Sequence, residues 1–209
     1  MKRSNRLGTS IATALASMAI ASTASADIFV RADNLVGDTT GPTSISGKWF
    51  VADSFSFGVE REMKESGEKG GTEDINIGIG ELQECTISKS MDSTSAALAQ
   101  AAINGRTLGS CEVCFSETQA ADSRPICYLK YKLDRCYVRS WSISGDADDR
   151  PTEEVAFYFN KIAFGFATTK DGREVHADSG SWDQERNRPW PEGEEGILDD
   201  LEPPPPESP

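Results

Sequence analysis

Large apolar side chains alternate with small or polar ones along much of the chain. Between Trp49 and Val59, the large apolar residues fall mostly at odd positions, and Ile75, Ile77 and Ile79 repeat this spacing. A period of two places alternate side chains on one face of a strand, so both runs predict β-strands. Further strands are expected at 27–32, 111–117, 126–133 and 136–143.

One apolar run changes its phase partway along. Its first half has apolar residues at the odd positions Val155, Phe157 and Phe159, and its second half has them at the even positions from Ile162 to Phe166. A change of parity exchanges the two faces of a strand. The pattern therefore predicts a β-bulge or a bend near Asn160-Lys161, as in strongly curved sheets and barrels.

The segment 93–103 follows a different pattern and predicts one short helix. It is rich in alanine, and Leu98 lies on the same helical face as Ala101 and Ala102. Asp92 or Ser93 can cap its first turn, and Gly105 can end it. The chain is thus expected to be mainly β, with this helix against the sheet.

The first 26 residues have the pattern of a secretory signal peptide. Three basic residues precede an apolar run from Ile11 to Ile20, and Ala24-Ser25-Ala26 offers a small-residue cleavage site. Cleavage after Ala26 would leave 183 residues and place the protein in the periplasm or outside the cell. The apolar run is too short for a comfortable membrane span.

The remaining chain is strongly acidic. Removal of the leader would take away three of the 21 basic residues and none of the 34 acidic ones, which leaves a net charge of −16. Such a chain repels phosphate backbones and anionic lipids, so neither nucleic acids nor membranes are expected as partners. The single histidine, His176, argues against histidine-based catalysis and His-rich metal sites. No cofactor is expected.

The composition changes sharply at the C-terminus. From Pro191 to Pro209 there are seven acidic residues, no basic residue and a run of four prolines. Proline cannot donate to a β-ladder and like charges repel, so 191–209 is predicted to be a disordered or extended tail. The alternative is that Ile197-Leu198 forms a short docking segment.

The five cysteines permit either disulfides or a metal or redox site. Cys111 and Cys114 have the CxxC spacing, but in a strand their side chains should point to opposite faces, and no second CxxC follows. Structural disulfides and buried thiols are therefore favoured. If the chain turns near Ala120-Ala121, Cys114 lies opposite Cys127, which predicts a disulfide between them.

Four blocks of the sequence, in this order, resemble the haemolysin-coregulated protein (Hcp) family of type VI secretion tube subunits. The resemblance covers most of 27–190, includes one helix at the expected place, and rests on the order of the blocks more than on any one of them. The blocks are Asp27–Val30 followed by Val36-Gly37, Glu84–Thr94, Asp149–Phe159, and Gly180–Asp183 followed by Asn187.

This resemblance implies a compact antiparallel β-barrel of two sheets with one flanking α-helix, over residues 27–190. It also implies a structural protein rather than an enzyme, one that forms hexameric rings, stacks them into a tube and can carry secreted effector cargo. The Gly-, Glu- and Lys-rich segment 60–74 is long for a hairpin connection and matches the family's extended loop, which reaches a neighbouring ring. The residues expected in that contact are Glu62, Met63, Lys64, Glu65, Gly67, Gly70 and Gly71.

Two other functions remain open at this stage. The signal peptide and the acidic tail are additions to the family's pattern, so the chain could be a monomeric exported binding module on the same barrel. An exported hydrolase would need two carboxylates held across a cleft, a distance that a sequence does not show.

Overall fold

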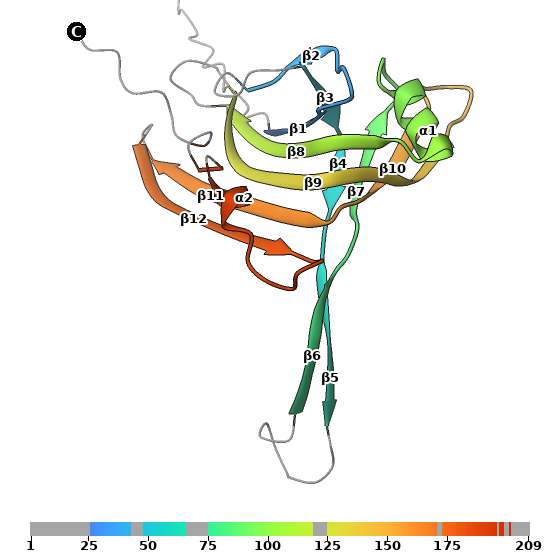
Figure 1. The fold of residues 1–209 in the computed structure, drawn as a ribbon. Helices are drawn as coiled ribbons and strands as arrows, with labels where there is room; N and C mark the ends of the chain where they lie inside the picture. The colour runs from blue at the N-terminus through green and yellow to red at the C-terminus, as the bar shows by residue number, and fades with distance from the viewer. Residues whose placement is uncertain are drawn as a thin grey trace, which may run out of the picture.

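The computed structural model describes residues 26–42, 48–65, 75–118, 125–170, 173–195, 197–198 and 201. This part of the chain is mainly β, with antiparallel strand pairing throughout and two short helices, α1 (Ser95–Asn104) and α2 (Pro191–Glu194) (Figure 1). The strands are β1 (Ala26–Ala32), β2 (Thr39–Thr40), β3 (Lys48–Ala52), β4 (Ser54–Ser56), β5 (Val59–Glu65), β6 (Ile75–Leu82), β7 (Cys85–Ser90), β8 (Thr107–Thr118), β9 (Pro125–Ser144), β10 (Thr152–Tyr158), β11 (Lys161–Lys170) and β12 (Arg173–Asp183).

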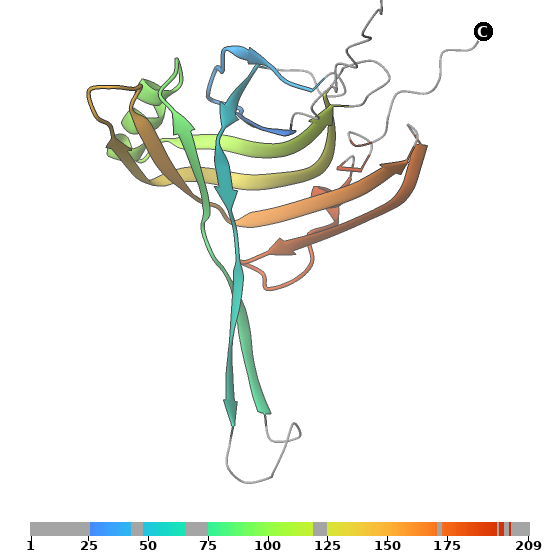
Figure 2. The same cartoon turned by 180° about the vertical axis from the view of Figure 1, so that it is seen from behind.

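Ten strands form one curved sheet in the order β2-β3-β1-β8-β9-β10-β7-β4, and β11 joins β12 to β9. The expected two-sheet barrel is not closed by hydrogen bonds, because β2 and β4, the strands at the two ends of this order, do not pair with each other. β3, which lies next to β2, and β4 are nevertheless consecutive in the chain, separated only by Asp53. The Asp53 N–H donates to the carbonyl of Ser88 on β7 at 2.8 Å. The chain therefore bridges the two ends of the sheet and wraps it around a core (Figure 2).

The long strand β9 explains the change of parity in the sequence. Its C-terminal half pairs with β10 and its N-terminal half pairs with β11, both along the same edge. Between the halves, Arg135 has a left-handed φ of 56°. The chain turns at Phe159–Asn160, where the Asn160 N–H donates to the carbonyl of Asp134 at 3.1 Å. The predicted bend is therefore a corner between two strands, and the two strands predicted at 126–133 and 136–143 are one.

The main core lies inside the curved sheet and beneath α1. It is filled by every second residue of each strand, because alternate side chains point to this side of the sheet. Gly105 ends α1 as expected, with a φ of 66° and its N–H bonded to the carbonyl of Ala101. The buried core includes Val30, Phe50, Ile87, Leu98, Leu108, Val113, Leu133, Val155, Phe157 and Ile162.

A second, smaller apolar cluster covers the opposite face of the sheet. It combines side chains of β1, β3, β8, β9 and β11 with Leu201. Ile197 and Leu201 are only 2% and 1% exposed, so the packed part of the chain continues past Trp190. The domain boundary and the start of the tail, both placed at Pro191 from composition, are therefore too early. The last eight residues, 202–209, lie outside the described residues.

Candidate assembly surfaces

A two-stranded hairpin, called here the arm, projects from the body. It consists of β5 and β6 and carries the segment predicted to reach a neighbour (Figure 1). Glu62 and Met63 lie on β5, whose backbone continues through Lys64 and Glu65. The flanks of the predicted loop thus form paired strands. The other three expected contact residues, Gly67, Gly70 and Gly71, lie outside the described residues.

The arm exposes apolar side chains on its first strand. Val59 is 61% exposed and Met63 is 63% exposed. Their neighbours Glu60, Arg61 and Glu62 are exposed as well. Exposed apolar residues on a hairpin that extends beyond its own body are available to another molecule.

The two strands of the arm are joined to each other at its root. The N–H of Gln83 donates to the carbonyl of Gly58 at 2.9 Å, and its side-chain amide donates to Glu60 at 3.2 Å. A groove of about 420 Å³ opens beside this root, lined by Leu82, Gln83, Arg139, Tyr158 and Gln184 among others. The hairpin pairing therefore continues to the point where the arm leaves the sheet.

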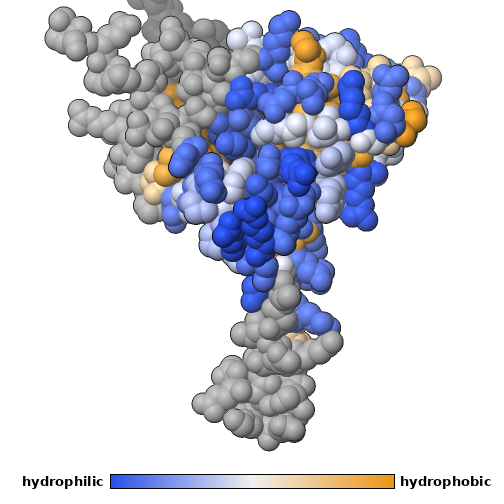
Figure 3. All heavy atoms as spheres, viewed as in Figure 1, coloured by the Kyte–Doolittle hydropathy of each residue, from blue (hydrophilic) through white to orange (hydrophobic). Residues whose placement is uncertain are grey.

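An aromatic face forms where β8, β9 and β11 extend beyond the enclosed core. Phe164 is 41% exposed and Phe166 is 39% exposed. The ring of Phe164 lies 6.1 Å from that of Tyr131, and the ring of Phe166 lies 6.3 Å from that of Tyr128. Phe115 on β8 continues the row, 6.5 Å from Tyr128. The coloured part of the side seen in Figure 3 is mostly hydrophilic, with small apolar patches.

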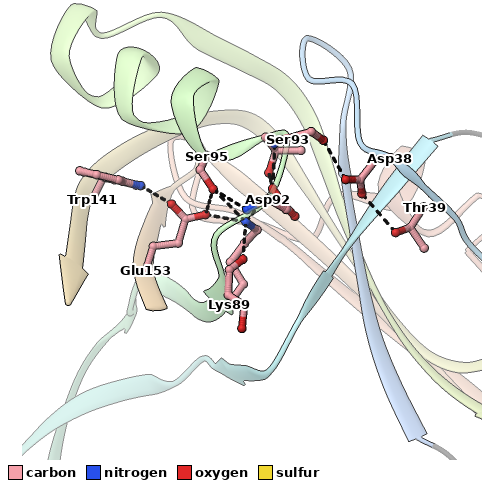
Figure 4. Close-up of polar contacts among 10 residues, drawn as sticks. Asp38, Thr39, Lys89, Asp92, Ser93, Ser95, Trp141 and Glu153 are labelled. Atoms are coloured by element: carbon pink, nitrogen blue, oxygen red, sulfur yellow. Dashed lines mark hydrogen bonds and ion pairs between the residues drawn. The ribbon is translucent and has the colours of Figure 1, made fainter. Parts of the chain in front are cut away.

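A buried polar cluster fixes the start of α1 to the sheet (Figure 4). Lys89 on β7 donates to Glu153 on β10 at 2.5 Å and to Asp92 at 2.8 Å. Glu153 also accepts from the Ser95 hydroxyl and from the Trp141 indole, each at 2.7 Å. The ion pair joins β7 to β10, and the hydrogen bonds of Glu153 add β9 and the helix, so both charges have partners.

The pKa of Asp92 lies below its ordinary value. Partial burial raises it, but hydrogen bonds from Lys89 and from the N–H and hydroxyl of Thr94 outweigh that effect. The predicted N-cap at Asp92 or Ser93 is not formed, because the residue just before the helix is Thr94, which makes no side-chain cap hydrogen bond. Asp92 instead accepts from the N–H and hydroxyl of Thr94.

The cysteines divide between the two faces of the sheet, as the strand position of the CxxC pair predicts. Cys111 belongs to the main core and Cys114 to the second cluster. The structure pairs Cys114 with Cys127 as a disulfide, with their Cα atoms 5.7 Å apart. The register differs from the expected one: Cys114 lies opposite Lys130, because the pairing of β8 and β9 shifts after Phe115.

Three thiols are free and buried, at Cys85, Cys111 and Cys136. Burial raises the pKa of the Cys85 and Cys136 thiols well above the usual range, and contact with Cys111 adds to the shift at Cys136. A protonated, buried thiol is a poor nucleophile and a poor metal ligand. Across the described ranges, no group of three acidic, histidine or cysteine residues has the geometry to hold a metal ion.

Neither helix in the described part of the chain has the length and apolarity needed to cross a bilayer.

Comparison with known proteins identifies relatives of this chain. The family model described as "Type VI secretion system effector, Hcp" matches residues 29–166. A structure described as a type six secretion system protein aligns over 79% of this chain and 100% of its own, with a TM-score of 0.68 and 23% identity. Hcp1 from Salmonella typhimurium aligns over 79% and 99%, with a TM-score of 0.60 and 15% identity. A type VI secretion system effector from Yersinia pestis aligns over 75% and 99%, with a TM-score of 0.54 and 15% identity. No curated protein matches the chain.

Proposed function

Because this chain belongs to the Hcp family of the type VI secretion system, we propose that it is a structural subunit whose copies form hexameric rings that can stack into a tube. The resemblance found in the sequence is thereby confirmed, and so is its mainly β, antiparallel fold. We propose, beyond this, that the protein forms rings, that the rings stack, and that they carry cargo. Membership of this family supports a structural role rather than a catalytic one.

The observation that carries the proposal is the arm. Val59 and Met63 lie on a strand that leaves the body, more than half exposed. A head-to-tail interface requires two different patches on one chain, a donor and an acceptor. The arm supplies a donor, and the aromatic face with Phe164 and Phe166 supplies a candidate acceptor.

Export is the second part of the proposal. Ala26, the last residue of the predicted leader, is the first residue of β1. Cleavage after Ala26 would remove one residue from β1 and leave the pairs from Asp27 to Ala32 with β8 intact. We infer that the mature protein is secreted or periplasmic, and that a ring of it could hold a secreted effector. Intact-mass measurement of the exported chain tests the cleavage site.

The deciding experiment is imaging of the mature protein. Negative-stain microscopy and light scattering at matched concentration should give annular particles with the mass of six chains. A mass of one chain at every accessible concentration would contradict ring formation and leave the monomeric binding module as the function.

A further inference from the structure

The last described residues form a strap across the outer face of β11 and β12. The strap consists of Trp190–Glu195 with Ile197, Leu198 and Leu201. It follows β12 through a reversal in which Asp183 bridges to Arg188, and α2 then lies over the β11–β12 hairpin (Figure 1). The family match ends at residue 166, so the strap lies beyond it.

Polar contacts place the first half of the strap. The carboxylate of Glu194 accepts from the Ser181 hydroxyl at 2.5 Å and from the Ser179 hydroxyl at 3.3 Å. The Trp190 N–H donates to the Ser181 oxygen at 2.9 Å. The Trp190 ring lies under the ammonium of Lys161, 5.0 Å away, which is within the range of a cation–π contact. The two serines of β12 thus bind the carboxylate of Glu194, and Lys161 of β11 contacts the ring of Trp190.

Apolar contacts place the second half. A Cβ added at Gly165 would lie 3.1 Å from Leu198 and 3.2 Å from Ile197, so the absent side chain of Gly165 leaves the room that these two residues fill. Leu201 joins the cluster of Phe29 and Ala167. The outer face of β11–β12 is therefore shaped to the strap at both ends.

The connection between the strap and the sheet is a short turn, 184–189. Asn187 in this turn has a left-handed φ of 50°, a conformation that asparagine adopts more readily than most residues other than glycine. Within the described residues β12 pairs only with β11, so it is an edge strand. A short connection at the end of an edge strand is a place where an element can exchange between copies.

We propose that the outer face of β11–β12 is a binding site that the strap of a second copy can fill, so that neighbouring copies are linked by strap exchange. The occupant follows from the contacts above, because every copy carries the same strap and would make the same hydrogen bonds and apolar contacts in trans. The proposal does not depend on ring formation, since it concerns a different face from the arm.

Two full-length variants test it. The donor carries Gly165→Leu, which fills the space of Ile197 and Leu198 and frees an intact strap. The tagged receiver carries Ile197→Asp and Leu201→Asp, which disable its strap and leave its outer face open. We expect the receiver to capture the donor at least tenfold above the capture by a tagged receiver that also carries Gly165→Leu.

That doubly altered receiver also measures any association through other surfaces, so the result is separate from the success or failure of ring formation. Equal capture by both receivers would overturn the proposal. Loss of cooperative urea unfolding in the donor or the receiver would overturn it too, because the strap would then be inseparable from the fold. Deletion of Arg186-Asn187 in the wild-type chain provides a second measurement: a shortened hinge should raise the fraction of linked copies, and an unchanged fraction would contradict exchange.

Discussion

Lys89 and Glu153 form an ion pair with 2.5 Å between nitrogen and oxygen, and neither side chain is exposed to solvent. Burial removes both charges from water. Hydrogen bonds with Ser95 and Trp141 and with the carbonyl of Ser90 replace part of the lost hydration. Since Lys89 belongs to β7 and Glu153 to β10, the pair also specifies which strand faces meet under α1. A buried pair of this kind specifies an arrangement more than it adds net stability.

Removal of one charge of the pair should be costly. We expect Glu153→Gln to lower the free energy of unfolding by about 3–5 kcal/mol, because it leaves the buried Lys89 ammonium without its counter-charge. Urea unfolding at neutral pH measures the change. Glu154→Gln, at the exposed neighbouring position, is the matched control and should have no effect. A loss of less than about 1 kcal/mol for Glu153→Gln would show that the cluster tolerates an unpaired lysine.

Asp92 should make stability depend on pH in the acid range. Its pKa is lowered in the folded protein from the ordinary 3.8, so the folded state binds the proton less readily than the unfolded state. The stabilisation is therefore fully present above about pH 5 and is lost as pH falls through 3.8 toward the folded pKa. Urea unfolding of the wild type and Asp92→Asn should differ by a constant amount at pH 5–7 and converge below pH 4. A difference that persists unchanged at pH 3 would contradict the shift.

The sequence identifies the strands and the helix because their signals are local. Alternation predicts β1 closely and most of β8, and Gly105 marks the end of α1. The alternating run from Trp49 to Val59 is divided between β3, β4 and the start of β5. A signal for the polar cluster was also present: Lys89 continues the inward phase of Cys85 and Ile87, and Glu153 begins that of Val155. A charge at an inward position of a strand requires a buried partner, and two such positions on neighbouring strands could have been paired.

Other features depend on long-range geometry that a single sequence does not carry. The corner at Asn160 could not be predicted from the local pattern, because it arises where β9 changes its partner from β10 to β11 along one edge. The opposite placement of Cys114 and Cys127 failed because an irregularity after Phe115 shifts the register. Burial of Ile197 and Leu201 was obscured by the surrounding acids and prolines, whose composition indicated a solvated tail. Two buried apolar side chains place this segment against the sheet, although its average composition is that of a solvated chain.

If the chain is exported as proposed, the disulfide between Cys114 and Cys127 should be present in the mature protein. A loop of the 13-residue separation that it closes stabilises a fold by roughly 3 kcal/mol in the chain-entropy account. Non-reducing peptide mapping should recover these two cysteines linked. The three buried thiols should react with iodoacetamide only after unfolding. Free Cys114 in the mapping, or labelling of Cys111 in the native protein, would contradict the assignment.

The arm should matter for assembly and not for folding. Val59→Ser combined with Met63→Ser removes exposed apolar surface, so the free energy of unfolding should stay within about 0.5 kcal/mol of the wild type. If the arm inserts into a neighbour, the same change should shift the particles seen by light scattering from the ring mass toward that of one chain. The matched control is Ile103→Ser, since Ile103 is 86% exposed on α1, outside the arm. Deletion of Glu62–Gly71 should act like the double variant and leave the body folded. Assembly that survives both changes would show that copies meet through other surfaces.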